Sequence, residues 1–161
     1  MSDFLHSFTT IDGSVYSISF SLFKADILDI DIDVFDLILK QVKDCGNNNY
    51  EVLMHLTKLV FSFLEDHDCI IYFYCDFAPI KKSKKSNHLS NQQFRSKIFT
   101  ALFEKLKHQS KIEEKPFNYI LRTAEIIDAD NGNHYISLIS NSGQGEKTSE
   151  MINSILSMND K

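Results

Sequence analysis

The segment Cys69-Ile-Ile-Tyr-Phe-Tyr-Cys75 decides the fold of this chain. All seven side chains are apolar or aromatic, so a strand formed here would have no face suited to water. This pattern is typical of a central strand that is covered on both sides. Asp76 and a lysine-rich run follow it, so a buried strand is expected to lead directly into a cationic loop.

The segments before this strand predict a hairpin, a third strand and a helix. Residues 4–10 and 15–23 flank an Asp-Gly turn, and the second of these segments alternates apolar residues with serines. Residues 27–43 fit a strand or a helix, and we favour a third strand over about 32–42. A helix that ends near Asp66 is predicted from an apolar stripe at helical spacing: Val52, Leu53, Leu56, Leu59, Val60, Phe63 and Leu64.

The segments after the central strand predict two helices and a second hairpin. A capping-box pattern at Ser90–Gln93 begins a helix that should run to about His108. Residues 119–128 and 134–140 flank an Asp-Asn-Gly-Asn turn, which is a strong hairpin signal. A short amphipathic helix closes the chain, and its apolar side chains are Met151, Ile152, Ile155 and Leu156.

The predicted order βββαβαββα indicates a single α+β domain over residues 1–161. It should contain a largely antiparallel sheet of about six strands with its helices packed on one face. A chain of 161 residues with 43% hydrophobic side chains can bury a core without disulfides or metals.

The three cysteines form no C-x-x-C pair and predict buried thiols in a reducing compartment. With neither a membrane-length apolar run nor a signal-peptide pattern, we expect a soluble cytoplasmic protein.

Charge is distributed unevenly along the chain. Residues 81–107, here called the basic patch, hold eight Lys and Arg side chains against one acid, whereas residues 1–80 carry a net charge of −9. Because the whole chain has a net charge of −5, nucleic acid is possible but not favoured, and anion binding must be local. The side chains expected to bind a ligand or partner lie at the end of the central strand: Asp76, Lys81, Lys82, Lys84, Lys85, His88 and Arg95.

Arg95 differs from the lysines because the helix phase turns it toward the apolar face. It could pair with Asp76 and join strand to helix, since a buried unpaired charge is costly. It could instead face a cleft and bind an anion, with Asp76 orienting it, or extend its head group to water. The loop lysines fit solvated surface residues or a site for phosphate-bearing ligands, and a lone loop histidine such as His88 is usually a surface residue.

No motif specifies a reaction. The chain has no His-x-x-x-His or Cys/His spacing for a metal and no Gly-x-Ser-x-Gly elbow, so no metal, cofactor or catalytic residue is predicted.

The sequence resembles a family of small uncharacterised bacterial proteins in four short segments. These are Tyr16-x-Ile18-x-Phe20, Ile71-Tyr-Phe-Tyr-Cys75-Asp76, Phe94-Arg95-x-x-x-Phe99 and Tyr135-Ile-Ser-Leu-Ile139. The resemblance implies a compact single domain and no particular activity.

Three functions remain open. The first is a non-enzymatic binding module whose basic patch meets an acidic protein, a nucleic acid or a second copy of the chain. The second is an enzyme or sensor for a small phosphorylated compound at the end of the central strand. The third is an antitoxin-like or immunity-type inhibitor, which small size and charge segregation suggest.

Overall fold

The computed structural model describes residues 4–23, 31–43, 49–75 and 88–159. Within them the chain forms one six-stranded sheet in the spatial order β1-β2-β3-β4-β6-β5. Neighbouring strands are antiparallel except β3 and β4, which run parallel and are connected through α1. The strands are β1 (Phe4–Thr9), β2 (Val15–Phe23), β3 (Asp33–Lys43), β4 (Cys69–Cys75), β5 (Tyr119–Ile126) and β6 (His134–Asn141).

In the described parts of the chain, three α-helices pack on this sheet. They are α1 (Asn49–Asp66), α2 (Asn91–Ile112) and α3 (Gly145–Asn159), and a short 3₁₀ helix, η3 (Ser142–Gln144), precedes α3. The α+β class and the largely antiparallel sheet are confirmed. The strand interpretation of the ambiguous segment 27–43 also holds, because residues 33–43 form a strand.

The central position of β4 is explained by its successive side chains, which point in turn to the two faces of the sheet and are apolar on both. Ile71 and Phe73 point into a large core between the sheet and helices α1 and α2. Ile70 lies on the opposite face, in a smaller core that includes Met151 of α3. Ile70 and Ile71 are both fully buried, which explains why this strand carries no polar face.

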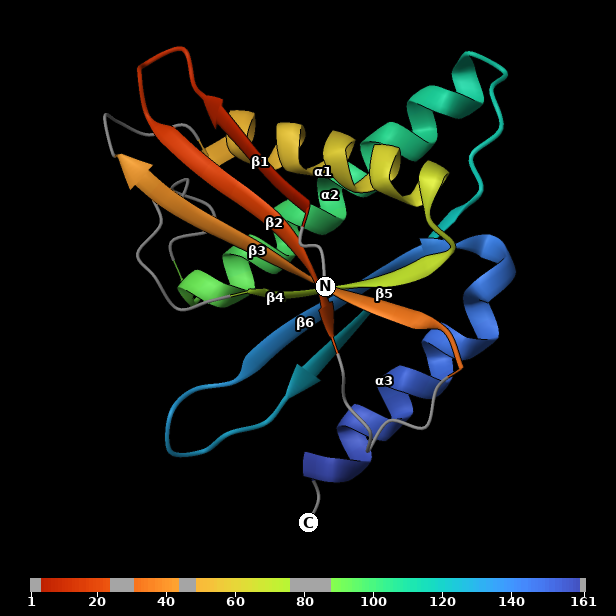
Figure 1. Cartoon of the computed structure of the whole chain (residues 1–161). Helices are drawn as coiled ribbons and strands as arrows, with labels where there is room; N and C mark the ends of the chain where they lie inside the picture. The colour runs from red at the N-terminus through yellow and green to blue at the C-terminus, as the bar shows by residue number, and fades with distance from the viewer. Residues whose placement is uncertain (1–3, 24–30, 44–48, 76–87, 160–161) are drawn as a thin grey trace.

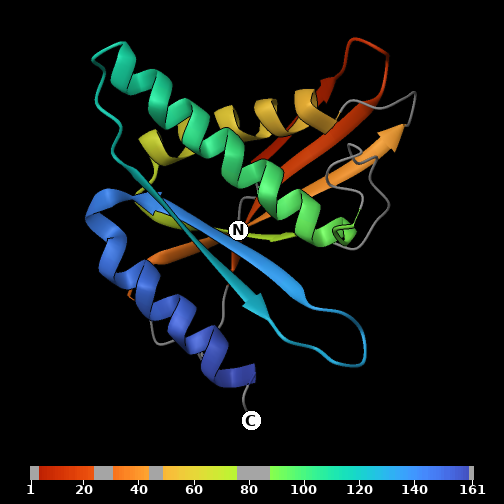
Figure 2. The same ribbon diagram turned by 180° about the vertical axis from the view of Figure 1, so that it is seen from behind.

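The expectation that all helices pack on one face is wrong. Helices α1 and α2 cover one face, and α3 lies against the other face over β5 and β6 (Figures 1 and 2). The reason is that β6, like β4, is apolar on both sides. Ile139 enters the large core, whereas Ile136 and Leu138 enter the small one. Without α3, the second face would expose these side chains to water.

Helix α2 begins as predicted but ends later. The Ser90 side chain accepts a hydrogen bond from the backbone N–H of Gln93, as an N-cap should. The helix continues to Ile112, about one turn beyond the predicted end at His108. It stops where Glu114 takes a left-handed conformation with φ of 55°. The N–H of Glu114 then donates to the Lys111 carbonyl, and that of Lys115 to the Ser110 carbonyl, which together form a Schellman motif.

Candidate anion-binding surface

The structure describes only part of the site predicted at the end of the central strand. Asp76 and the four lysines at 81, 82, 84 and 85 lie outside the described residues. His88 is exposed just before α2, and Arg95 is half-buried in the first turns of that helix. The pairing of Arg95 with Asp76 therefore stays a prediction.

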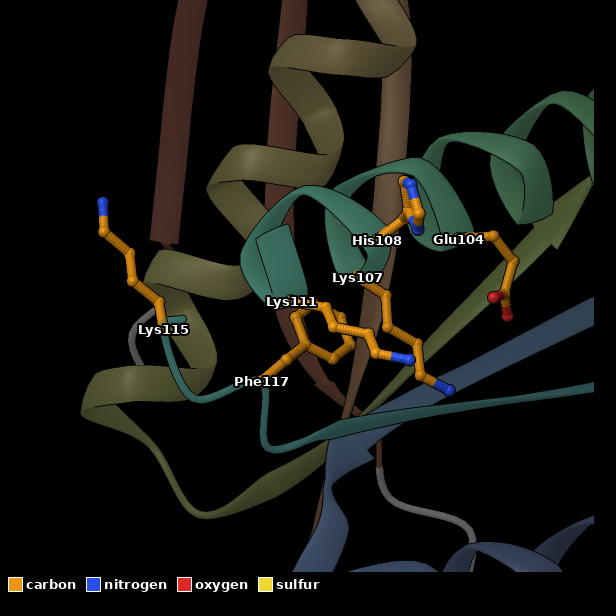
Figure 3. Close-up of a pocket in the computed structure, with 6 residues that line it drawn as sticks. All are labelled: Glu104, Lys107, His108, Lys111, Lys115 and Phe117. Carbon is orange, nitrogen blue, oxygen red and sulfur yellow. The ribbon is translucent and has the colours of Figure 1, made fainter. Parts of the chain in front are cut away.

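A cationic hollow lies instead at the far end of α2. Its volume is about 360 Å³, and its open rim is formed by the last turns of the helix and the following loop. Figure 3 shows the side chains of Lys107 and Lys111 extending from the helix on the side where the ring of Phe117 lies. The six lining residues, here called the cationic hollow, are Glu104, Lys107, His108, Lys111, Lys115 and Phe117.

Helical spacing explains why four of these residues share a surface. Glu104, Lys107, His108 and Lys111 follow one another at intervals of three, one and three residues, and side chains three or four apart lie on the same helix face. The Schellman turn at the helix end then reverses the chain, which carries the last two lining residues back toward that face.

Phe117 gives the hollow an apolar, well-packed floor. Its ring centroid lies 5.5 Å from that of Phe61, 5.3 Å from that of Phe103 and 5.4 Å from that of Tyr119, all in edge-to-face geometry. These contacts join the ring to the large core. The ring is nevertheless half-buried, so part of it stays available on the surface.

The charges around the hollow are unequally compensated. Lys115 forms an ion pair of 3.2 Å with Glu113. Hydrogen bonds from Gln109 and from Lys115 hold the pKa of Glu113 below its usual range. Among the described residues, Lys107 and Lys111 form no ion pair. Two lysines are thus free to bind an acidic group above an aromatic floor.

The sequence interpretation found only one edge of this surface. Lys107 belongs to the basic patch, but Lys111, Lys115 and Phe117 lie beyond it. The i, i+4 spacing of Lys107 and Lys111 could have placed both lysines on one helix face. The prediction missed this pair because it ended the helix at about His108, before Lys111. The position of Phe117 carried no signal, because it depends on the turn at Glu114.

Other chemistries find little support in the described part of the chain. No group of three or more His, Cys, Asp or Glu side chains there could hold a metal ion. Burial, followed by the charges of Asp33 and Asp68, raises the pKa of the buried Cys69 thiol to about 12, so this cysteine is a poor nucleophile. None of the described helices combines the length and apolar character that crossing a membrane requires.

Comparison of the chain with protein-family models, with curated proteins and with solved structures found no match. The resemblance to small uncharacterised bacterial proteins therefore stays a prediction. Functional inference rests on the geometry of the chain itself.

Proposed function

We propose that this protein is an interaction module whose cationic hollow receives an acidic segment of a partner protein. The observation that carries the proposal is the pair Lys107 and Lys111, which have no ion-pair partner among the described residues and line the same hollow as the half-buried ring of Phe117. A carboxylate can bind the lysines while an apolar neighbour in the same segment covers the ring. Binding of this kind requires no catalytic group.

An acidic polypeptide suits the hollow better than a nucleic acid does. Phe117 is the one Phe, Tyr or Trp ring among the residues that line the hollow, whereas single-stranded nucleic acids usually stack successive bases on several such rings. Glu104 at one end and Glu113 beside Lys115 would repel a continuous phosphate backbone. A peptide can place separate carboxylates between these acids.

The test is an NMR titration of the full chain with a short glutamate-rich peptide that contains one phenylalanine. We expect amide shifts to concentrate on residues 104–117 and to weaken as salt is raised from about 50 to 300 mM, because exposed charges are screened. Lys111→Ala should weaken binding roughly two- to fivefold, the range expected for one exposed ion pair of ~0.4–1 kcal/mol.

Lys97→Ala is the matched control, because Lys97 is an exposed lysine of the same helix that does not line the hollow. Equal losses in the two variants would show a diffuse charge effect and contradict a specific hollow. A phosphate-bearing oligonucleotide or inorganic phosphate that shifts the same amides more strongly than the peptide would overturn the assignment of an acidic protein segment.

A further inference from the structure

A hydrogen-bonded chain of three titratable side chains lies on the α3 face of the sheet, away from the cationic hollow. The Tyr74 hydroxyl lies 2.7 Å from Nδ1 of His134, and Nε2 of the same imidazole lies 2.9 Å from Oδ2 of Asp128. The three residues come from the end of β4, the start of β6 and the loop before β6. A phenol, an imidazole and a carboxylate are thus connected in that order.

The sheet register brings the first two side chains together. Tyr74 pairs with Ile136 across β4 and β6, so His134 is its diagonal neighbour on the same face. The two ring centroids lie 5.9 Å apart. Since 60 residues separate Tyr74 from His134 in the sequence, only the insertion of β6 beside β4 creates this contact.

The hairpin loop holds the carboxylate in place. Oδ1 of Asp128 accepts hydrogen bonds from the backbone N–H groups of Asp130 and Asn131, both at 3.1 Å. The backbone N–H of Asp128 donates to Oδ1 of Asn133, also at 3.1 Å. The carboxylate is therefore oriented by its own turn before it meets the imidazole.

The hydrogen-bonding capacity of the three side chains decides which group donates and which accepts in each hydrogen bond. A carboxylate can only accept, so Nε2 of His134 donates to Asp128, and in the neutral imidazole Nδ1 is then left to accept from the Tyr74 hydroxyl. The hydrogen bond to His134, followed by those to Asn131, lowers the pKa of Asp128 to about 2, so its carboxylate is charged at neutral pH. A nucleophile, a base and a group that orients the base are arranged in this way in hydrolytic triads.

A second tyrosine provides an internal contrast. The Tyr135 hydroxyl donates to Oε1 of Glu125 at 2.8 Å. Burial and that neighbouring carboxylate raise the pKa of Tyr135 to about 12. A carboxylate is a much weaker base than an imidazole, so Tyr135 is hydrogen-bonded without being activated. Of these two tyrosines, it is Tyr74 whose hydroxyl lies against an imidazole, a base suited to removing its proton.

The surroundings select the class of substrate. Acidic side chains dominate the hairpin, with Glu125, Asp128 and Asp130, and residues 123–146 contain no lysine or arginine. Among the described residues, these carboxylates disfavour an anionic substrate at the hairpin. Ile126 and Ile155 pack in the same small core as Tyr74 and supply apolar surface nearby. An uncharged ester with a small apolar acyl group fits these surroundings best.

We propose that Tyr74 is a nucleophile toward small uncharged carboxylic esters, with His134 as its general base and Asp128 as a positioning residue. The Tyr74 oxygen bonds to the ester carbonyl carbon while Nδ1 of His134 takes the phenolic proton. The ester C–O bond then breaks, and the leaving alcohol receives that proton. Water next attacks the acyl-tyrosine with His134 again as base, and the proton returns to Tyr74 as the acid departs. Ester and water become acid and alcohol, and nothing is oxidised or reduced.

The site has access to the water that this second step needs. The side chains of His134 and Asp128 are each 25% exposed, and the Tyr74–His134 contact is only partly buried. The activity is separate from binding at the cationic hollow, and neither proposal depends on the other.

The test uses the full chain with p-nitrophenyl acetate, followed by peptide mapping for an added acetyl group. We expect release of p-nitrophenolate with acetylation of Tyr74, and loss of both in Tyr74→Phe. His134→Asn keeps an acceptor near the Nδ1 position but removes the base, and should slow acetylation of Tyr74 about 10²-fold or more. Tyr135→Phe is the matched control and should react like the parent chain.

Three outcomes would overturn the proposal. The first is acetylation of Tyr74 no faster than that of Tyr135. The second is an unchanged rate in His134→Asn, with thermal melting showing that the variant is folded. The third is faster turnover of p-nitrophenyl phosphate than of the acetate, which would refute the assigned substrate class.

Discussion

The ring of Phe20 in β2 stacks on the ring of Phe63 in α1, with centroids 4.2 Å apart and planes inclined by only 6°. Phe63 also makes edge-to-face contacts with Phe4 and Phe35, at 5.2 Å and 5.0 Å. A single helical side chain therefore joins the first three strands of the sheet. This connection places Phe63 at the centre of the large core.

We expect Phe63→Ala to lower the free energy of unfolding by about 3–5 kcal/mol, because it removes a buried ring and leaves a cavity. Urea unfolding followed by circular dichroism measures this loss. Ile11→Ala is the control, since Ile11 is 97% exposed in the first hairpin and should change stability by less than about 0.5 kcal/mol. Similar values for the two variants would contradict the assigned core.

Glu114 holds a left-handed conformation that favours glycine, so Glu114→Gly should stabilise the chain by about 0.5–1 kcal/mol. The neighbouring Glu113 has φ of −80°, and Glu113→Gly should destabilise the chain instead, because glycine there only adds freedom to the unfolded state. Thermal melting of the two variants checks the opposite signs. A lower melting temperature for Glu114→Gly would contradict the Schellman turn that forms one side of the cationic hollow.

Gly132 in the second hairpin has φ of +90°, and an added Cβ would meet no atom closer than 3.6 Å. The cost of Gly132→Ala should therefore come from the backbone alone and reach about 1 kcal/mol or more. Gly143→Ala is the matched control, because a Cβ there would meet nothing within 4 Å and no positive φ is required. That variant should be neutral or slightly more stable in urea unfolding.

Asp128 should make stability depend on acidic pH. Its pKa is about 2 in the folded chain and 3.8 as an ordinary value, so the folded state binds its proton less readily than the unfolded state. The stabilisation is complete above about pH 4 and is lost as the pH falls toward 2.

Urea unfolding of the parent chain and of Asp128→Asn between pH 2 and 7 measures this effect. The two curves should converge at low pH and separate above about pH 4. Asp130→Asn is the control from the same loop, because among the described residues the Asp130 carboxylate makes no hydrogen bond. A constant difference between the parent chain and Asp128→Asn across the pH range would contradict the assigned pairing with His134.

Much of the fold was predictable because its signals are local. The serine alternation of β2, the Asp-Gly turn before it and the Ser90 cap of α2 each act within a few residues. The placement of α3 was not predictable in this way. The apolar stripe of a helix shows that it must be covered, but not which sheet face covers it.

The candidate sites were less predictable than the fold. The basic patch includes Lys107 of α2, yet the cationic hollow depends on where α2 ends and how Glu114 turns the chain. Tyr74 and His134 gave no sequence signal as a pair, because nothing in a one-dimensional pattern shows that β6 lies between β4 and β5.

By itself, the sequence determined most of the strands and helices and the central position of residues 69–75, since these follow from the period of apolar side chains along the backbone. Only the tertiary structure decided that α3 covers the second face, that Lys107, Lys111 and Phe117 line one hollow, and that Tyr74 meets His134. The physical reason is that strand order, helix ends and diagonal contacts are chosen by the packing of the whole chain. The local pattern of apolar side chains limits the possible strand orders and helix positions, but it does not select one of them.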